Sequence, residues 1–401
     1  MTSLRPAALP HVLVGVSGGI AVYKAVEVVR SLAKEGFTLT VVPTQSAKRF
    51  VLPLTFAAVS QSPVLDDDTA WNASGGWFEH IEAARRADVM LVAPATANTI
   101  AKMAGGIADN LLTAIYLAFR GTVIVAPTMN WAMYEHAATQ ENLRVLAERG
   151  CVVMPTGTGE LACGEEGSGR MAEPEAIVAA VKRAAAGRAQ GPLSGRTVVV
   201  TSGGTREAID AVRFIGNRSS GKMGRAVADA AYLRGAQVVL ITTVAADSAP
   251  YRVIEVESAE QMEAAVQREC ASAAVLVMAA AVADYRPAQT LDGKIERGEH
   301  ETLSLDLVRN PDILSGAERP GLFRVAFAAE AGPRIERARA KRLAKKADML
   351  VFNDILAAGV GIGSDDNEIT IIAADGERHV PRTSKQECAR AIVSAIESHL
   401  V

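Results

Sequence analysis

Aromatic residues and cysteines are scarce in this chain of 401 residues. Phe, Trp and Tyr together make up 4 % of it, and its four cysteines form no C-x-x-C pair: Cys151, Cys163, Cys270 and Cys388. Cysteines spaced this widely, with no histidines at zinc-site spacing, argue against both a zinc site and a disulfide framework.

Long apolar runs and a strong net charge are absent as well. No stretch approaches the roughly 18 uninterrupted apolar residues of a membrane span, and Met1 to Pro10 hold one Arg and no apolar core. The formal net charge of −3 gives no electrostatic reason to expect nucleic acid or an anionic membrane as a partner. We therefore expect a cytoplasmic protein that acts on small molecules.

The dinucleotide fingerprint G-x-G-x-x-G is missing from both turns where it would be expected. Residues 12–16 and 197–201 are largely apolar, and each run enters a Ser-Gly-Gly turn, Ser17-Gly18-Gly19 and Ser202-Gly203-Gly204. Such a turn points backbone N–H groups and a helix N-terminus at an anion, so each can hold a phosphate. An ordinary tight turn is the alternative at both positions.

Hydrophobic residues make up 49 % of the chain, and short apolar runs alternate with helical stretches. This alternation predicts parallel sheets with right-handed crossovers. The predicted fold class is α/β, with two doubly wound, Rossmann-like domains whose sheets are mostly parallel. Helical periodicity is lost after residue 187, so we predict a domain at 1–187, a linker at 188–195 and a second domain at 196–401.

The same periodicities predict the individual elements. In the first half the strands are expected at 12–16, 38–42, 89–93, 122–126 and 152–154, and helices at 21–36 and 98–104. In the second half we expect strands at 197–201, 238–242, 275–279, 324–328 and 349–352, and helices near 222–234, 259–270 and 334–346. An edge strand at 368–373 and a closing helix at 384–400 are expected to end the fold.

Polar residues follow several strands of the first half, at the sheet edge where ligands bind in this architecture. His80 precedes one strand, the segment Thr96-Ala97-Asn98-Thr99 ends it, and Asn130 follows the next. Each has a structural alternative. His80 can be structural or simply exposed, Thr96 or Asn98 can be a helix N-cap, and Asn130 can sit in a turn before core methionines.

Residues 159–171 are too rich in glycine for a regular element and are expected to form a mobile lid that carries Cys163 over a pocket. A thiol in such a loop is chemically available, whereas a structural cysteine is normally buried.

In the second half, Gly216, Gly221 and Lys222 have P-loop spacing, but Met223 stands where a Walker site needs a hydroxyl. A helix capped by Ser219 or Ser220 is the structural alternative there. Lys341 and Lys345 lie at i and i+4, so both can meet a triphosphate, or they can form a solvated basic face.

The order of the motifs in the first half resembles the flavin-dependent cysteine decarboxylases. More specifically, they resemble the N-terminal half of the bifunctional phosphopantothenoylcysteine decarboxylase and phosphopantothenate–cysteine ligase of coenzyme A biosynthesis. The shared motifs, over residues 12–181, are the first Ser-Gly-Gly turn, the histidine, P-A-T-A-N, P-x-M-N-x-x-M and A-C-G-x-x-G-x-G-R-M. The resemblance implies a flavodoxin-like flavoprotein domain whose FMN site is built by Gly15, Ser17, Gly18, Thr44, Thr96, Ala97, Asn98 and Thr99.

It also implies roles for three residues. His80 is expected to be the catalytic base or its partner, Asn130 to hold the departing carboxylate, and Cys163 to give a proton late in the reaction. The resemblance implies active sites between subunits of a trimer. Trimers of the first half joined by dimers of the second would make a dodecamer.

Residues 194–400 resemble the ligase half of the same bifunctional proteins, through S-G-G-T-R-E, N-x-S-S-G-K-M-G, A-A-V-A-D-Y, N-P-D-I, F-A-A-E and K-x-x-x-K. The resemblance implies that Asn217 contacts an acyl-cytidylate and that Lys294 neutralises the reacting phosphate. It further implies that CTP, with Mg²⁺, is bound by Met278, Ala279, Ala280, Asp284, Lys294, Asn310, Pro311, Asp312, Ile313, Phe327, Lys341 and Lys345. No carboxylate can be assigned to Mg²⁺ from the sequence.

Two positions depart from the ligase pattern. The family often has K-I-K-K, where this chain has Lys294-Ile295-Glu296-Arg297, and Arg309 replaces a lysine before N-P-D-I. Arg309 keeps the charge but not the geometry of a lysine.

Two other classes of protein remain as alternatives. A flavin-binding regulatory protein would keep the fold without turnover, but the joint presence of His80, Asn130 and Cys163 argues against it. A nicotinamide oxidoreductase would need the missing fingerprint and an acidic residue about 20 positions beyond it.

Overall fold

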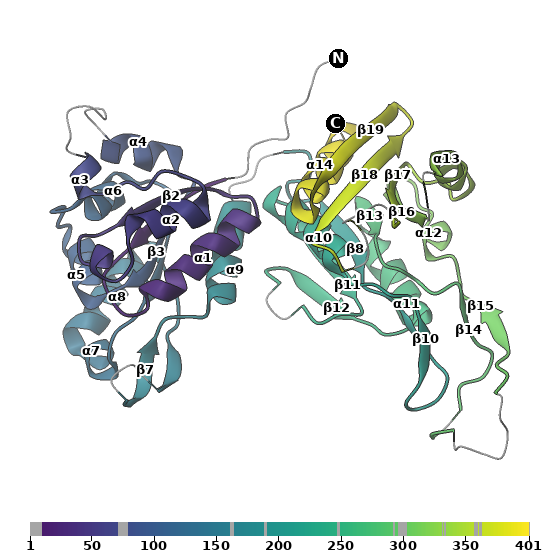
Figure 1. Cartoon of the computed structure of the whole chain (residues 1–401), viewed down its shortest axis with the longest axis horizontal. Coiled ribbons are helices and arrows are strands. Elements are labelled where there is room, and N and C mark those ends of the chain that lie inside the picture. Colours follow the sequence, from purple (N-terminus) through teal and green to yellow (C-terminus); the bar gives the residue numbers. More distant parts are fainter. Residues whose placement is uncertain are drawn as a thin grey trace. The chain divides into compact units, whose positions relative to one another are not determined.

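A computed structural model of the chain describes residues 10–70, 79–160, 164–187, 191–246, 249–291, 293–295, 303–330, 332, 334–356, 360 and 363–400. The chain divides into two compact units, residues 8–188 and 189–401 (Figure 1). Each unit has its own central sheet, and the predicted α/β class with mostly parallel sheets is confirmed. None of the helices in this part of the chain is long and apolar enough to cross a membrane.

The first unit is built on a parallel sheet with the order β2-β1-β3-β4-β5. Nearly every residue of the first four strands is buried, as expected for strands covered on both faces. The strands are β1 (His11–Val16), β2 (Thr38–Pro43), β3 (Val89–Ala95), β4 (Thr122–Pro127) and β5 (Val152–Val153). This is the flavodoxin-like order, and its direction reverses between β1 and β3.

Helices cover both faces of this sheet (Figure 1). On one face lie α1 (Val22–Lys34) and α9 (Pro174–Ala186), and on the other lie α4 (Glu79–Arg86), α5 (Ala97–Gly105), α6 (Leu111–Ala118) and α8 (Ala137–Glu148). Shorter elements complete the unit: η1 (Ala47–Arg49), α2 (Pro53–Ser60), α3 (Asp67–Ala70) and α7 (Trp131–Glu135). The sheet is therefore a closed core, and ligands have access only at its edges.

The second unit has an eight-stranded sheet with the order β12-β11-β8-β13-β16-β17-β18-β19. Its six parallel strands are β8 (Thr197–Ser202), β11 (Gln237–Thr242), β12 (Arg252–Glu255), β13 (Val275–Met278), β16 (Phe323–Glu330) and β17 (Met349–Asp354). In chain order they follow the Rossmann pattern 3-2-1-4-5-6, which reverses between β8 and β13. The helices α10 (Lys222–Leu233) and α14 (Lys385–His399) cover one face, and α11 (Ala259–Cys270), α12 (Ile313–Gly316) and α13 (Ile335–Ala344) cover the other.

The predicted edge strand is wrong in one respect. β18 (Asp366–Ala373) is not the edge, because a further antiparallel strand, β19 (Gly376–Ser384), pairs with it. β19 is exposed along most of its length, so it lacks the apolar alternation by which a strand is predicted.

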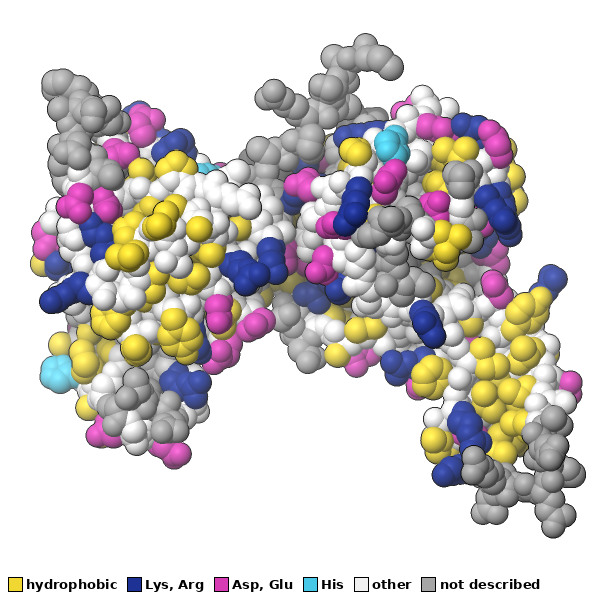
Figure 2. All heavy atoms as spheres, viewed as in Figure 1, with side chains coloured by type: hydrophobic (Ala, Val, Ile, Leu, Met, Phe, Trp, Pro, Cys, Tyr) yellow, Lys and Arg dark blue, Asp and Glu magenta, His cyan; other side chains and the backbone are white. Residues whose placement is uncertain are grey.

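Two short ribbons project from the second sheet (Figure 1). One pairs β9 (Arg206–Ala208) with β10 (Phe214–Gly216), and the other pairs β14 (Tyr285–Pro287) with β15 (Leu307–Arg309). We call these four strands the arm. The arm carries exposed apolar side chains, among them Phe214, Tyr285, Leu307 and Val308. Figure 2 shows apolar side chains gathered on this part of the second unit.

Candidate active sites

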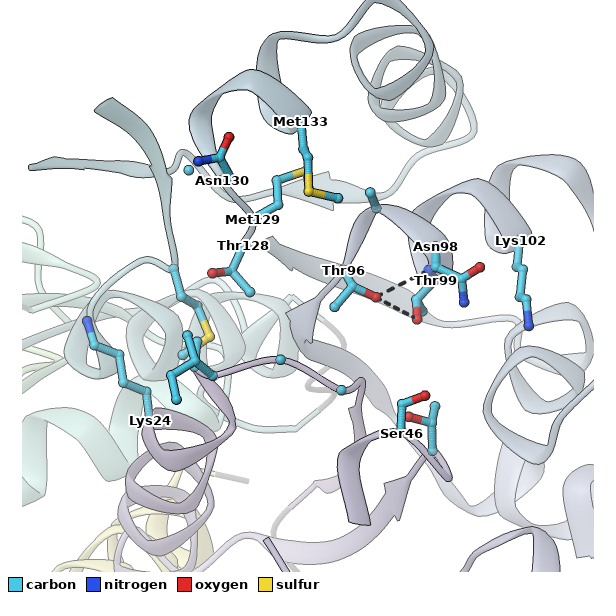
Figure 3. Close-up of a pocket in the computed structure, with 18 of the residues that line it drawn as sticks. Lys24, Ser46, Thr96, Asn98, Thr99, Lys102, Thr128, Met129, Asn130 and Met133 are labelled. Carbon is cyan, nitrogen blue, oxygen red and sulfur yellow. Dashed lines mark hydrogen bonds between the residues drawn. The ribbon is translucent and has the colours of Figure 1, made fainter. Parts of the chain in front are cut away.

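The first unit has a pocket of about 1080 Å³ beyond the carboxyl ends of β1 and β3, where the strand order reverses (Figure 3). Open α/β sheets bind their ligands at this place. Of the predicted FMN residues, six line the pocket: Gly18, Thr44, Thr96, Ala97, Asn98 and Thr99. Asn130 lines it too. The fold therefore brings together residues from four separate segments of the sequence.

Gly15 and Ser17 are not among the lining residues, and in the structure Gly15 has a packing role and Ser17 a hydrogen-bonding role. A Cβ on Gly15 would lie 2.2 Å from Cδ1 of Leu112, so glycine is needed where β1 packs against α6. The buried Ser17 hydroxyl donates to the carbonyl of Pro94 at 2.7 Å and accepts from the N–H of Thr96 at 2.9 Å. Ser17 thus ties the two loops that form the pocket floor.

Gly15→Ala is expected to lower the free energy of unfolding by about 1 to 3 kcal/mol, the usual range for overpacking a tight core. Thermal unfolding of the chain measures this loss. Adding Leu112→Val, which removes the methyl group that the new Cβ meets, should restore much of it. An unfolding temperature unchanged by Gly15→Ala would contradict this packing role.

The predicted N-cap at Thr96 is confirmed, because its hydroxyl accepts from the N–H of Thr99 at 3.4 Å at the start of α5. The same residue also lines the pocket, so the cap and a binding role are compatible. Glycine is required at position 18 for a steric reason, because a Cβ there would lie 2.4 Å from Cβ of Ser46. The first Ser-Gly-Gly turn therefore allows two loops to meet closely at the pocket.

The side chain of Asn130 is held at both ends. Its Oδ1 accepts from the N–H of Ala132 at 2.9 Å and caps α7, while its Nδ2 donates to Oε2 of Glu165 at 2.8 Å. The indole N–H of Trp131 donates to the same Glu165 oxygen at 2.9 Å. Figure 3 shows Asn130 beside Met129 and Met133 at the pocket wall. Met133 is largely exposed, so the alternative that it is a core residue is wrong, whereas Met129 is partly buried and packs against the core of the unit.

The glycine-rich segment forms a regular element where it is described, contrary to expectation. β6 (Gly157–Glu160) and β7 (Glu166–Arg170) pair as an antiparallel hairpin. A Cβ on Gly167 would lie 2.6 Å from Cβ of Trp131, and one on Gly169 would lie 2.3 Å from the Met129 carbonyl oxygen. These glycines permit close docking of β7 on the loop that bears Asn130. Cys163 lies outside the described residues.

His80 lies in the first turn of α4 and does not line the pocket of its own chain. Sequence reasoning also missed three basic lining residues: Lys24, Lys102 and Arg170. Lys24 pairs with Glu173 at 2.9 Å, and Lys102 pairs with Asp109 at 2.7 Å. Arg170 belongs to the A-C-G-x-x-G-x-G-R-M motif, but the two lysines lie on helices whose sequence carries no motif that would indicate a pocket.

In the second unit, the loop after β13 is joined to the second Ser-Gly-Gly turn. The N–H of Ala281 donates to the Gly203 carbonyl at 2.8 Å, and the N–H of Ala283 donates to the Thr205 hydroxyl at 2.9 Å. The N–H of Ala280 donates to the Thr201 hydroxyl at 3.1 Å. The strand order reverses here as well, so the predicted Ala279 and Ala280 lie at the expected ligand edge.

Two asparagine side chains brace the same loop. Nδ2 of Asn217 donates to the carbonyl of Val282 at 2.9 Å, and Nδ2 of Asn310 donates to the carbonyl of Ala283 at 2.8 Å. The Gly203 backbone is left-handed at φ 86°, and a Cβ there would lie 2.1 Å from the Thr243 hydroxyl oxygen. The structure therefore gathers Asn217, Asn310 and the turn at one edge.

Charged side chains cluster beside this loop. Lys345 pairs with Asp312 at 3.3 Å. Burial lowers the pKa of Lys341, as does the positive charge of Lys345, while Glu330 and Asp284 act in the opposite direction. Lys341, Lys345, Asp284 and Asp312 thus form one cluster, and the alternative of a solvated basic face is wrong for the half-buried Lys341.

The apolar members of the predicted CTP site contribute mainly to packing. Met278 and Ile313 are buried in the core, and Phe327 is half-buried against it. Pro311 is half-buried in the turn that precedes α12. The predicted side-chain cap of α10 is wrong, because the N-cap is Gly221 at φ 72° with no side-chain cap, and the Ser219 hydroxyl accepts the Gly221 N–H.

Lys294 is exposed in a loop that is held by Asp210, a residue that sequence reasoning missed. The carboxylate of Asp210 accepts backbone N–H groups from Ile295, Val212 and Arg213, at 3.0, 2.7 and 2.7 Å. These hydrogen bonds, with the one from Ile295 foremost, lower the pKa of Asp210 to about 2. The available signal was the aspartate itself, since Asp side chains often accept backbone N–H groups two residues further along in an Asx turn.

Glu296 and Arg297 lie outside the described residues, and Arg309 is exposed in β15. Within the described parts of the chain, no three His, Cys, Asp or Glu side chains are placed to hold a metal ion.

Both halves match known families. Residues 2–186 match the family model described as Flavoprotein, and residues 193–400 match the one described as DNA/pantothenate metabolism flavoprotein C-terminal domain. Among solved structures, a cysteine-to-serine mutant of PPC decarboxylase complexed with pantothenoylaminoethenethiol is 35 % identical, covering 43 % of this chain and 97 % of that chain (TM-score 0.41). The C-terminal domain of Coenzyme A biosynthesis bifunctional protein CoaBC is also 35 % identical, covering 53 % and 98 % (TM-score 0.45).

Full-length relatives carry the name Coenzyme A biosynthesis bifunctional protein CoaBC. The one from Vibrio cholerae is 43 % identical, over 97 % of this chain and 98 % of the relative. Those from Bacillus subtilis and Mycobacterium tuberculosis are 42 % and 43 % identical, over 96 % and 97 % of both chains respectively. The resemblance drawn from the motifs is thereby confirmed, and the chain belongs to the family of bifunctional CoaBC proteins of coenzyme A biosynthesis.

Proposed function

We propose that this chain carries out two consecutive steps of coenzyme A biosynthesis. The second unit joins 4′-phosphopantothenate to cysteine, and the first unit decarboxylates the product, 4′-phosphopantothenoylcysteine, to 4′-phosphopantetheine. The observation that carries the proposal is the match of both halves, over 97 % of the chain, to bifunctional relatives. The two alternatives, a regulatory flavoprotein and a nicotinamide oxidoreductase, leave the second unit without a role.

The pocket beyond the carboxyl ends of β1 and β3 fits FMN. Small residues at Gly18, Gly19 and Ala97 leave room for a flat ring, and hydroxyls and amides at Thr44, Thr96 and Asn98 offer hydrogen bonds. When bound, FMN would supply reversible two-electron chemistry: it would oxidise the cysteinyl thiol to a thioaldehyde, whose CO₂ loss is easy because the carbanion is delocalised as an enethiolate, and would then return the hydride to give the saturated thiol.

The chain's own groups would position the substrate and move protons. The Asn130 amide has its Oδ1 fixed as a helix cap, so its N–H₂ group is oriented to hold the substrate carboxylate. Cys163 would supply the late proton, and His80 would act as the base or its partner. Because His80 is not part of its own chain's pocket, we expect it to serve the pocket of a neighbouring subunit.

The ligation needs activation, because a carboxylate has no good leaving group. We propose that the 4′-phosphopantothenate carboxylate attacks the α-phosphate of CTP, that pyrophosphate leaves, and that the cysteine amine then displaces CMP. Lys341 and Lys345 would bind the triphosphate, Lys294 would neutralise the reacting phosphate, and Asn217 would contact the acyl-cytidylate. Mg²⁺ would be held largely by the triphosphate and water.

The assembly proposed for the chain combines trimers of the first unit with dimers of the second. The apolar patch on the arm supports the dimer, since monomeric proteins rarely expose a contiguous patch of this kind (Figure 2). A cytoplasmic location remains a prediction from the sequence.

Two separate assays test the proposal. The purified chain should carry FMN bands in its absorption spectrum and release CO₂ from 4′-phosphopantothenoylcysteine without CTP. In the presence of Mg²⁺, it should also release pyrophosphate from CTP, and only when 4′-phosphopantothenate is present. Failure of the FMN-loaded protein in either assay would contradict the corresponding half of the proposal.

Asp210→Asn is expected to lower kcat/KM of the ligation by about 10- to 100-fold, because the loop that carries Lys294 loses its anchor. The decarboxylation should be unchanged, which gives an internal control. Since the pKa of Asp210 is lowered to about 2, the anchor is complete above the ordinary value of about 3.9 and is lost as the pH falls toward 2. Unchanged ligation in this variant would contradict the anchoring role.

A further inference from the structure

At the wall of the first pocket, the carboxylate of Glu165 accepts hydrogen bonds from two side-chain N–H groups. Oε2 of Glu165 accepts from Nδ2 of Asn130 at 2.8 Å and from Nε1 of Trp131 at 2.9 Å. Both donors lie at the start of α7, next to the lining residues Met129 and Met133. Two N–H groups that converge on one oxygen form a carboxylate site, whichever carboxylate they hold.

The site is built rather than accidental. The cap from Asn130 Oδ1 to the Ala132 N–H fixes the direction of the amide, so Nδ2 can only point away from the helix. The strand β7 docks on the same loop through the close approach of Gly167 to Trp131 and the hydrogen bond from the Met129 N–H to the Gly169 carbonyl at 3.0 Å. Glu165 immediately precedes that strand, and this docking holds its carboxylate near both donors.

We propose that Glu165 is a stand-in for the substrate carboxylate, and that Asn130 and Trp131 together bind that carboxylate once Glu165 has left. The inference rests on the proposed decarboxylase function and extends it by two residues, Trp131 as a second donor to the substrate carboxylate and Glu165 as an internal competitor. Glu165 keeps the donors paired in the free protein and lowers the apparent affinity for the substrate. It has no such effect on the product, which has no carboxylate to place there.

Linkage gives the size of the effect. If only a fraction of the free protein has Glu165 away from the donors, the apparent dissociation constant of the substrate rises by the reciprocal of that fraction. The side chain of Glu165 is exposed, so its charge-assisted hydrogen bonds compete with water and are weaker than buried ones. We expect the competition to raise KM by about 3- to 10-fold.

The experiment measures CO₂ release from 4′-phosphopantothenoylcysteine by the FMN-loaded full-length protein, with 4′-phosphopantetheine as a product inhibitor. Glu165→Ala should lower KM by about 3- to 10-fold with kcat within about twofold, and leave the inhibition constant of the product unchanged. Glu166→Gln is the matched control, because it removes the same charge one residue further along. This control should change neither constant.

Trp131→Phe, made in the Glu165→Ala protein, tests the second donor. It removes the indole N–H and keeps a ring beside Gly167, and it should raise KM again by at least about threefold. FMN absorbance in each variant reports whether the pocket is intact.

Three results would overturn the inference while the wild type is active. They are an unchanged or higher KM in Glu165→Ala, an equal fall of KM in Glu166→Gln, and a parallel change in product inhibition. A wild type that releases no CO₂ would contradict the proposed decarboxylase, and the inference with it. The two failures are therefore distinguishable.

Discussion

Asn130→Asp is expected to lower kcat/KM for decarboxylation by about 1000-fold, because a carboxylate-binding donor becomes a carboxylate. The aspartate keeps an oxygen to accept the Ala132 N–H, so α7 retains its N-cap and the local fold is preserved. What changes is the group that faces the substrate, which now repels the charge that it would have held.

The measurement compares CO₂ release, FMN content and ligation in the same purified protein. FMN content and ligation should stay close to wild-type values. Asn110→Asp is a matched control, since Asn110 also lines the pocket and caps a helix, α6, through its Oδ1. Decarboxylation in Asn130→Asp within tenfold of wild type would show that Asn130 does not hold the carboxylate.

Lys341→Gln is expected to raise the KM for CTP in the ligation by at least about 100-fold, because a half-buried cation next to a triphosphate contributes a strong charge-assisted contact. Lys341 is the member of the cluster whose pKa burial lowers, and among the residues that the structure describes none forms an ion pair with it as Asp312 does with Lys345. Its positive charge is therefore more available to a new anion than that of Lys345.

Lys346→Gln is the matched control for this variant. Lys346 follows the same helix but pairs with Glu318 at the surface, where ion pairs contribute little. Lys346→Gln should leave the KM for CTP unchanged, and both variants should decarboxylate normally. Equal effects of the two substitutions would indicate general electrostatic attraction rather than a triphosphate site.

The central sheets could be predicted from the sequence because their strands are buried on both faces. Apolar runs such as Val12–Val16 and Val198–Val200, alternating with helical stretches, are typical of strands in the middle of a parallel sheet. β19 could not be predicted, since its exposed residues carry no periodic signal. The hairpin of β6 and β7 could not be predicted either, because its glycines argued against a regular element, whereas Gly167 and Gly169 permit close packing.

The site residues also divide into those with a local sequence signal and those without one. Residues that immediately follow a buried strand, such as Thr96 and Asn130, were predicted because the topology alone places them at the ligand edge. Contacts between distant segments were not predictable. Glu165 meets a residue 35 positions away, and Asp210 meets Ile295 across 85 positions, so neither pairing leaves a local pattern.

The most direct test of the bifunctional assignment uses cysteine labelled at its carboxyl carbon. The FMN-loaded protein is supplied with this cysteine, 4′-phosphopantothenate, CTP and Mg²⁺, and pyrophosphate and labelled CO₂ are followed together. We predict one labelled CO₂ for each pyrophosphate, and none without CTP. Pyrophosphate without labelled CO₂, or labelled CO₂ that does not depend on CTP, would contradict the assignment of both steps to this chain.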